Sequence, residues 1–188
     1  PIYNRSIFIE DCLNSVINQS YRPIELILVD DGSTDNSNEI LNTFKKQNES
    51  DNFKIEIIYQ ENSGAPTARN NGFEKSKGEY IQFLDSDDIL LENKLESQFN
   101  YIQINDCDMV YSKAQHISEN KELLNFYWGD KLNNTSDDFF NFSWQTMCPL
   151  YKREAVNKIG LWDVKLNINQ DWEYCIRTIL SGVKIGFH

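Results

Sequence analysis

Short apolar runs alternate with helical stretches along most of this chain. Four apolar runs predict strands, at residues 25–29 (ELILV), 55–59, 80–84 (YIQFL) and 108–111. Apolar residues at helical spacing predict helices over residues 7–19, 67–75 and 93–104, and a further one that turns Ile40, Leu41 and Phe44 inward. Parallel strands need such long crossovers. The pattern therefore predicts a Rossmann-like α/β domain, with a mostly parallel central sheet and helices on both faces.

The regular pattern is interrupted once and then resumes. Residues 112–143 are rich in Asn, Asp and aromatic residues, and no element is assigned to them. Beyond them we expect a strand over residues 147–151, helices over 154–159 and 170–181, and a last strand over 183–187.

The size and the two ends of the chain set its domain organisation. A chain of 188 residues and 22.0 kDa has the size of one domain. The opening PIYN looks like the tail of a strand whose apolar body is missing, and the chain stops at His188 as a strand finishes. We therefore expect residues 1–188 to be a single domain, truncated at both ends, that lacks its first strand and its C-terminal elements.

Charge, cysteine content and hydrophobicity limit the partners and the cellular compartment that the chain can have. The net charge of -11 and the scattered Lys and Arg residues exclude a nucleic-acid partner. The four cysteines form no CxxC pair, which disfavours a zinc site and fits reduced thiols in a cytoplasm. No apolar run approaches the roughly 18 residues of a membrane span.

Carboxylates gather where the predicted strands end. Asp85, Asp87 and Asp88 follow the strand at 80–84, and several carboxylates at one strand end repel each other unless a cation or hydrogen-bond donors compensate them. Magnesium and manganese favour oxygen ligands, which a DxD spacing supplies. A solvated, helix-capping turn is the alternative. Ligands of such sheets bind at the carboxyl ends of the strands, which favours a functional role.

Four further residues have two interpretations each. Asp30 and Asp31 either bind the base or ribose of a nucleotide or cap the next helix. Arg69 lies in the first turn of its helix, where the helix dipole disfavours a cation, so ligand contact competes with plain surface exposure. Asp171, at the start of a helix, either complements the dipole or serves as a general base toward a hydroxyl group.

Other catalytic classes lack their residues. His116 and His188 are the two histidines and no motif surrounds either, which disfavours a Ser/His/Asp hydrolase or a His-rich metal site. Neither GxxxxGK[ST] nor GxGxxG is present, so phosphates must be held in another way, which favours a metal.

Seven segments together resemble the family-two inverting glycosyltransferases of the GT-A fold. In chain order they are PIYN, SVINQSY, ELILVDDGSTDNS, NSGAPTARNNG, GEYIQFLDSDD, PLYKREAVNKIGLWD and QDWEYCIR. The resemblance implies a nucleotide-diphosphate sugar donor, most commonly a UDP-sugar, and a glycan or lipid-linked glycan acceptor. It also implies Mn²⁺ or Mg²⁺, and transfer with inversion at the anomeric carbon.

The resemblance also assigns roles by position. Asp87 would be the principal metal ligand, Asp85 would lie near the ribose and metal, and Asp31 would contact the base. Pro1, Tyr3 and Arg69 would line the nucleotide pocket. Asp171 matches the catalytic base of a motif usually read Glu-Asp, and Gln170 replaces the Glu, which puts a role for that neighbour in doubt.

The family's commonest setting is bacterial surface polysaccharide synthesis, such as capsule or O-antigen. Residues 112–143 would then be an acceptor-side insertion. We expect a cytoplasmic enzyme, at the inner face of the membrane through parts not present in this chain. A non-catalytic nucleotide-sugar-binding domain is the alternative. A receiver-type signalling module is the weakest one, because residues 144–177 have no place in that shorter fold.

Overall fold

The computed structural model describes residues 1–118, 120–133 and 144–188, and this part contains six helices and eight strands. The helices are α1 (Ile9–Ile17), α2 (Ser37–Asn48), α3 (Ala65–Lys75), α4 (Lys94–Asn105), α5 (Arg153–Ile159) and α6 (Gln170–Leu180). The strands are β1 (Ile24–Asp30), β2 (Phe53–Tyr59), β3 (Tyr80–Ile81), β4 (Met109–Tyr111), β5 (Ala114–Ile117), β6 (Leu123–Trp128), β7 (Leu150–Lys152) and β8 (Ile185–Phe187).

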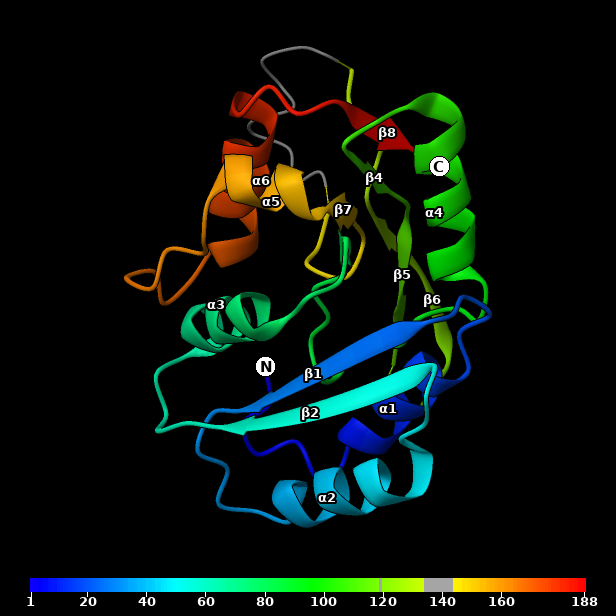
Figure 1. Ribbon diagram of the computed structural model, residues 1–188. Coiled ribbons are helices and arrows are strands. Elements are labelled where there is room, and N and C mark those ends of the chain that lie inside the picture. Colours follow the sequence, from blue (N-terminus) through cyan, green and yellow to red (C-terminus); the bar gives the residue numbers. More distant parts are fainter. Residues whose placement is uncertain (119, 134–143) are drawn as a thin grey trace.

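The first half of the chain is built around the parallel pair β1 and β2. Their register runs from Ile24 opposite Phe53 to Asp30 opposite Tyr59. Helices α1 and α2 bury their apolar residues against these strands in one cluster, and α3 lies over the opposite face (Figure 1). Gly72 lets α3 approach closely, because a Cβ there would lie 3.4 Å from a methyl carbon of Val29. The apolar run of β1 is thus covered on both faces, as its sequence predicts.

The second half of the chain contains a four-stranded sheet in the order β3-β7-β4-β8. Strands β4 and β8 are parallel, whereas β7 runs antiparallel to both of its neighbours. The expected α/β class is confirmed, and β7 is the departure from a parallel sheet. The described residues directly before it, 144–149, form no helix, and an antiparallel strand needs no crossover helix. Helices α5 and α6 cover one side of this sheet and α4 the other (Figure 1).

Three strand predictions are too long. The last strand, expected over residues 183–187, begins at Ile185. The strand expected over residues 80–84 ends at Ile81, where its pairing with Tyr151 of β7 ends. The strand expected over 147–151 begins at Leu150, after a turn in which the amide of Cys148 donates to the carbonyl oxygen of Gln145. The predicted helices agree with α1 to α6 to within about two residues at each end.

The unassigned segment 112–143 contains an antiparallel hairpin formed by β5 and β6. Residues 134–143 of this segment lie outside the described residues, so its predicted role as an acceptor-side insertion stays a prediction. None of the described helices is long and apolar enough to cross a membrane.

The carboxyl ends of β1 and β3 meet the N-terminal loop at one edge of the molecule. The amide of Ile2 donates to the carbonyl oxygen of Val29, and the amide of Asp31 donates to that of Ile2, at 2.8 Å each. A cavity of about 570 Å³ lies between β1 and β3, and Pro1 and Arg69 are among the residues that line it. The residues that carry the predicted chemistry gather at this edge.

Candidate active site

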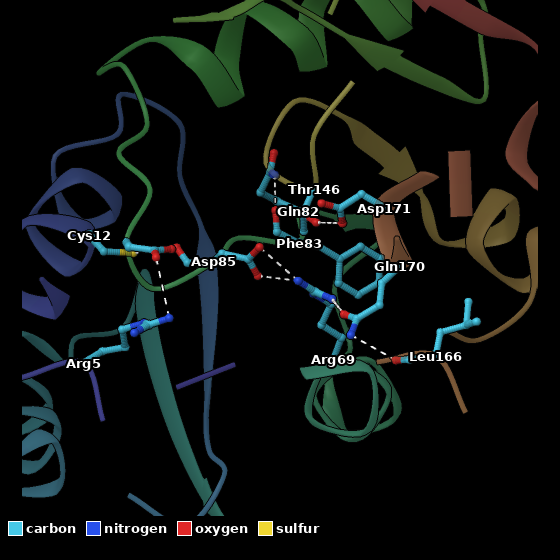
Figure 2. Close-up of polar contacts among 11 residues, drawn as sticks. Arg5, Cys12, Arg69, Gln82, Phe83, Asp85, Thr146, Leu166, Gln170 and Asp171 are labelled. Carbon is cyan, nitrogen blue, oxygen red and sulfur yellow. Dashed lines mark hydrogen bonds and ion pairs between the residues drawn. The ribbon is translucent and has the colours of Figure 1, made fainter. Parts of the chain in front are cut away.

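Arg69 is a buried cation that joins three segments of the chain. Only 6% of the residue is exposed. From α3, its Nη2 donates to the two carboxylate oxygens of Asp85 at 2.6 and 2.9 Å (Figure 2). Its guanidinium carbon lies 4.5 Å above the ring of Trp162. A buried charge is tolerated where it is paired and hydrogen-bonded in this way. The position of Asp85 is therefore set by Arg69. Since α3 begins at Ala65, Arg69 is its fifth residue and lies just past the first turn, in which the sequence placed it.

A pair of hydrogen bonds fixes the ring beneath Arg69. The side chain of Asn70 donates to the carbonyl oxygen of Trp162 at 2.9 Å and accepts from the Trp162 amide at 2.8 Å. The indole of Trp162 in turn stacks on Tyr174 of α6, with ring centroids 4.1 Å apart and planes 9° apart. The ARN and LWD segments, which are 92 residues apart, are thus locked together at the site.

The start of α6 carries Gln170 and Asp171 to the same place. Nη1 of Arg69 donates to Oε1 of Gln170 at 3.0 Å. The hydroxyl of Thr146 donates to a carboxylate oxygen of Asp171 (Figure 2). A continuous chain of contacts therefore runs from Asp85 through Arg69 to the residue beside Asp171. The structure thus brings together Asp85, Arg69 and Gln170, which the sequence singled out separately.

Two carboxyl groups at the site hold their protons more tightly than usual. Burial raises the pKa of Asp171 and the charge of Asp85 adds to this, while the Thr146 hydrogen bond and Arg69 oppose it. Burial, followed by the charges of Asp85, Asp87 and Asp171, raises the pKa of Asp88 to about 7. The four carboxyl groups therefore share one electrostatic field, although they come from two distant segments.

The predicted metal ligands differ in availability. Both oxygens of Asp85 accept from Arg69, whereas the side chain of Asp87 is 49% exposed and lies 3.8 Å from a guanidinium nitrogen of Arg5. Within the part of the chain that the structure describes, no three His, Cys, Asp or Glu side chains are grouped to hold a metal. Mg²⁺ commonly takes one or two carboxylates together with waters and substrate phosphates. Asp87 fits that limited role better than Asp85.

The N-terminal loop is tied to the turn after β1. Asn4, with a φ of 52°, accepts from the amide of Thr34 at 2.8 Å, and its own amide donates to Ser33 at 3.0 Å. This leaves the neighbouring Tyr3 47% exposed at the edge where the strands end. Pro1 lies on the other side of the loop, at the wall of the cavity. Contact of Pro1 and Tyr3 with a nucleotide stays a prediction.

The Asp31 carboxylate is buried and accepts three hydrogen bonds from its own chain. The residue is 3% exposed, and its carboxylate accepts from Gln60 at 2.7 Å and from the amides of Ser63 and Gly64 at 2.8 Å each. Asp30, which is also buried, accepts from the amide of Ser33 at 3.0 Å. Neither residue caps α2 through its own side chain; Asp31 orders the turn into α3 instead. A carboxylate has about four acceptor positions, so the predicted base contact of Asp31 remains compatible with these bonds.

Sequence reasoning missed three contributors to the site. Trp162 lies in the segment PLYKREAVNKIGLWD, and nothing in that segment indicates that its aromatic ring would lie beneath a cation. Thr146 and Arg5 lie outside every acidic cluster, and only the fold places them beside Asp171 and Asp87. Gln170 was noticed as a departure from a motif, but its contact with Arg69 could not be predicted.

The architecture, with carboxylates at the carboxyl end of β3 facing a carboxylate on α6, is that of the GT-A class of glycosyltransferase folds. A crystal structure of S. aureus TarS residues 1–349 in complex with UDP shares this fold. Its TM-score is 0.78 at 22% identity, over all of this chain and 56% of that one. The family model described as glycosyl transferase family 2 matches residues 1–160. This chain belongs to glycosyl transferase family 2.

Two curated relatives extend the comparison. The putative teichuronic acid biosynthesis glycosyltransferase TuaG of Bacillus subtilis is 43% identical over 189 residues, which covers all of this chain and 71% of TuaG. Glycosyltransferase GlyG of Streptococcus pneumoniae is 42% identical over 128 residues, which covers 68% of this chain. That match spans 41% of GlyG, less than half of its length.

Proposed function

We propose that this chain transfers a sugar, with inversion, from a nucleotide-diphosphate donor to a hydroxyl group of a glycan or lipid-linked glycan. The observation that carries the proposal is the chain of contacts from Asp85 through Arg69 to Gln170, next to Asp171. These contacts support a single site in which Asp85, on the donor side, and Asp171, the proposed base, act together. The similarity to TuaG supports a role in bacterial surface polysaccharide synthesis. Action in the cytoplasm, at the inner face of the membrane, stays a prediction.

In the proposed reaction Asp171 is the general base. Its carboxylate accepts the proton of the acceptor hydroxyl while that oxygen attacks the anomeric carbon of the donor sugar. The bond from that carbon to the diphosphate oxygen breaks in the same step, and the electron pair leaves with the nucleoside diphosphate. Attack opposite to the leaving group inverts the configuration. The raised pKa of Asp171 supports the role, because a base works best when its pKa approaches the working pH.

The other predicted residues serve the donor. In the proposal Tyr3, Pro1 and Asp31 contact the nucleoside, and Arg69 keeps Asp85 oriented toward the ribose. Asp87 would be the principal carboxylate ligand of Mn²⁺ or Mg²⁺, and Asp85 would be the second ligand, through the acceptor positions that its two bonds to Arg69 leave open. The bound cation would neutralise charge that develops on the leaving diphosphate.

A panel of nucleotide sugars tests the activity. The purified protein is incubated with UDP-, GDP- and dTDP-sugars, with Mn²⁺ or with EDTA, and released nucleoside diphosphate is measured. Because the TarS structures hold UDP and UDP-GlcNAc, UDP-sugars are the first to try. We expect slow, metal-dependent hydrolysis of one donor class. Saturable binding without any release would favour the alternative of a non-catalytic nucleotide-sugar-binding domain.

The stereochemistry needs its own experiment. With the donor identified, the anomeric proton of the first product is followed by NMR before mutarotation scrambles it. An α-linked donor should give a β-product. An initial product with the donor's own configuration would contradict single displacement and the assignment of Asp171 as base.

A further inference from the structure

The side-chain amide of Gln170 is held at both of its ends. Its Oε1 accepts from Nη1 of Arg69 at 3.0 Å, and its Nε2 donates to the carbonyl oxygen of Leu166 at 3.1 Å (Figure 2). An amide can accept at one atom and donate at the other, which a carboxylate cannot do. The two bonds therefore fix which way the side chain faces.

Gln170 stands where a loop enters α6. It is the first residue of α6 and follows Asn169, which has a left-handed φ of 58°. A pocket of about 340 Å³, lined by Arg69 and residues 167–171, opens beside it. Ile168 in the preceding loop is 74% exposed. The side chains of the first turn of α6 reach two other parts of the chain, because Gln170 bonds to Arg69 of α3 and Asp171 accepts from Thr146.

Charge is the second reason why an amide suits the position. The first turn of α6 contains two acidic residues, Asp171 and Glu173, and Glu173 is paired with Arg177 of the same helix. A neutral Gln170 leaves Asp85 as the one carboxylate bonded to Arg69 among the described residues, and Asp171 without an adjacent like charge. A glutamate, the usual residue of the family motif, could keep the bond to Arg69 but would lose the bond that Gln170 donates to the Leu166 carbonyl oxygen.

We infer that Gln170 is a positioning residue of the transfer reaction. Its two hydrogen bonds, to Arg69 and to the Leu166 carbonyl oxygen, are called the clamp, and they hold the start of α6 against Arg69. The clamp sets the place of Asp171 relative to Asp85, and therefore the place of the base relative to the donor. This inference rests on the proposed function for its catalytic consequence, but the clamp itself is a property of the fold.

Two substitutions test the clamp, with a matched control. Gln170→Leu keeps the size of the side chain and removes both hydrogen bonds, whereas Gln170→Glu keeps an acceptor and adds charge. Gln103→Leu on α4 is the control, because Gln103 donates one hydrogen bond, at 2.6 Å, to the hydroxyl of Tyr80 and is not bonded to Arg69 or to α6. A small misplacement of a reacting group can cost on the order of 100-fold in rate.

We therefore expect Gln170→Leu to lower kcat by at least about tenfold, with the donor Kd within about threefold of that of the unsubstituted protein. Gln170→Glu should lower kcat less than Gln170→Leu does, because its carboxylate keeps an acceptor for Arg69. The control should change neither. An unchanged kcat for Gln170→Leu in an active protein would overturn the inference, even if its melting temperature fell.

Hydrogen exchange keeps the inference separate from the proposed function. If the unsubstituted protein turns over no donor, the proposed function fails, and the clamp is then tested by exchange at amides 173–175, because Glu173 is the first residue of α6 whose amide is bonded within the helix, to the carbonyl oxygen of Asn169. These amides should exchange faster in Gln170→Leu than in the unsubstituted protein or in Gln103→Leu, with the last turn of α6 unaffected. Equal exchange at amides 173–175 in the three proteins would show that Gln170 does not position this turn.

Discussion

Removal of the Asn70 side chain should destabilise the whole protein and loosen the site. In Asn70→Ala, the buried amide and carbonyl groups of Trp162 both lose their partner, at 2.8 and 2.9 Å. Leaving a buried polar group unpaired costs roughly 1–3 kcal/mol. Two such groups give a loss of about 3 kcal/mol at the lower part of that range. For a domain of this size, that corresponds to a fall in melting temperature of about 6–12 °C.

Thermal and urea unfolding measure this loss, with Asn71→Ala as the matched control on the same helix. Asn71 donates to the side chain of Gln60 at 2.6 Å, so its removal leaves no backbone group unpaired, and about 1 kcal/mol or less should be lost. Turnover should also fall in Asn70→Ala, because Trp162 lies beneath Arg69. Equal melting temperatures for the two variants would refute the idea that Asn70 locks the Trp162 segment to α3.

Three further predictions concern the carboxyl groups. The pKa of Asp88, raised by burial to about 7, exceeds its ordinary 3.8, so its stabilising effect is complete below pH 4 and lost as pH rises through 7. Urea unfolding at pH 5 and 8 should therefore show a smaller loss toward pH 8 in Asp88→Asn than in the unsubstituted protein. Asp87→Ala should weaken donor binding in the presence of Mn²⁺, and an unchanged calorimetric titration would argue against Asp87 as a ligand. Because burial raises the pKa of Asp171, kcat should decline on the acid side at a higher pH than an ordinary aspartate would give; a flat profile down to pH 4 would exclude this.

The α/β architecture follows from local patterns in the sequence. The run ELILV predicts β1 because a strand covered on both faces needs apolar side chains on both, and the spacing of Leu41 and Phe44 predicts the buried face of α2. The antiparallel direction of β7 could not be predicted. Its three residues have the same composition in either direction, and only its partners β3 and β4 decide the pairing.

The chemistry of the site was predictable as residue types but not as contacts. Asp85, Asp87 and Asp171 stand out because they are acidic residues at the end of a predicted strand or the start of a predicted helix, and ligands of such α/β sheets bind at the carboxyl ends of the strands. Arg69 bonds to Asp85 and to Gln170 only because α3, the segment after β3 and α6 meet in the fold. Along the chain, Asp85 is 16 residues from Arg69 and Gln170 is 101 residues from it. The signal in the sequence was an arginine near the start of the helix expected over residues 67–75, where the helix dipole disfavours a cation and a partner is therefore expected.

The central claim is that Asp171 takes the proton of the acceptor while the donor binds elsewhere in the site. Asp171→Asn keeps the shape of the side chain and removes the basic carboxylate. With the donor found in the nucleotide-sugar panel, calorimetry should give a donor Kd within about threefold of that of the unsubstituted protein. Transfer should be abolished in the same preparation. Transfer at the unsubstituted rate, or loss of donor binding, would contradict the account.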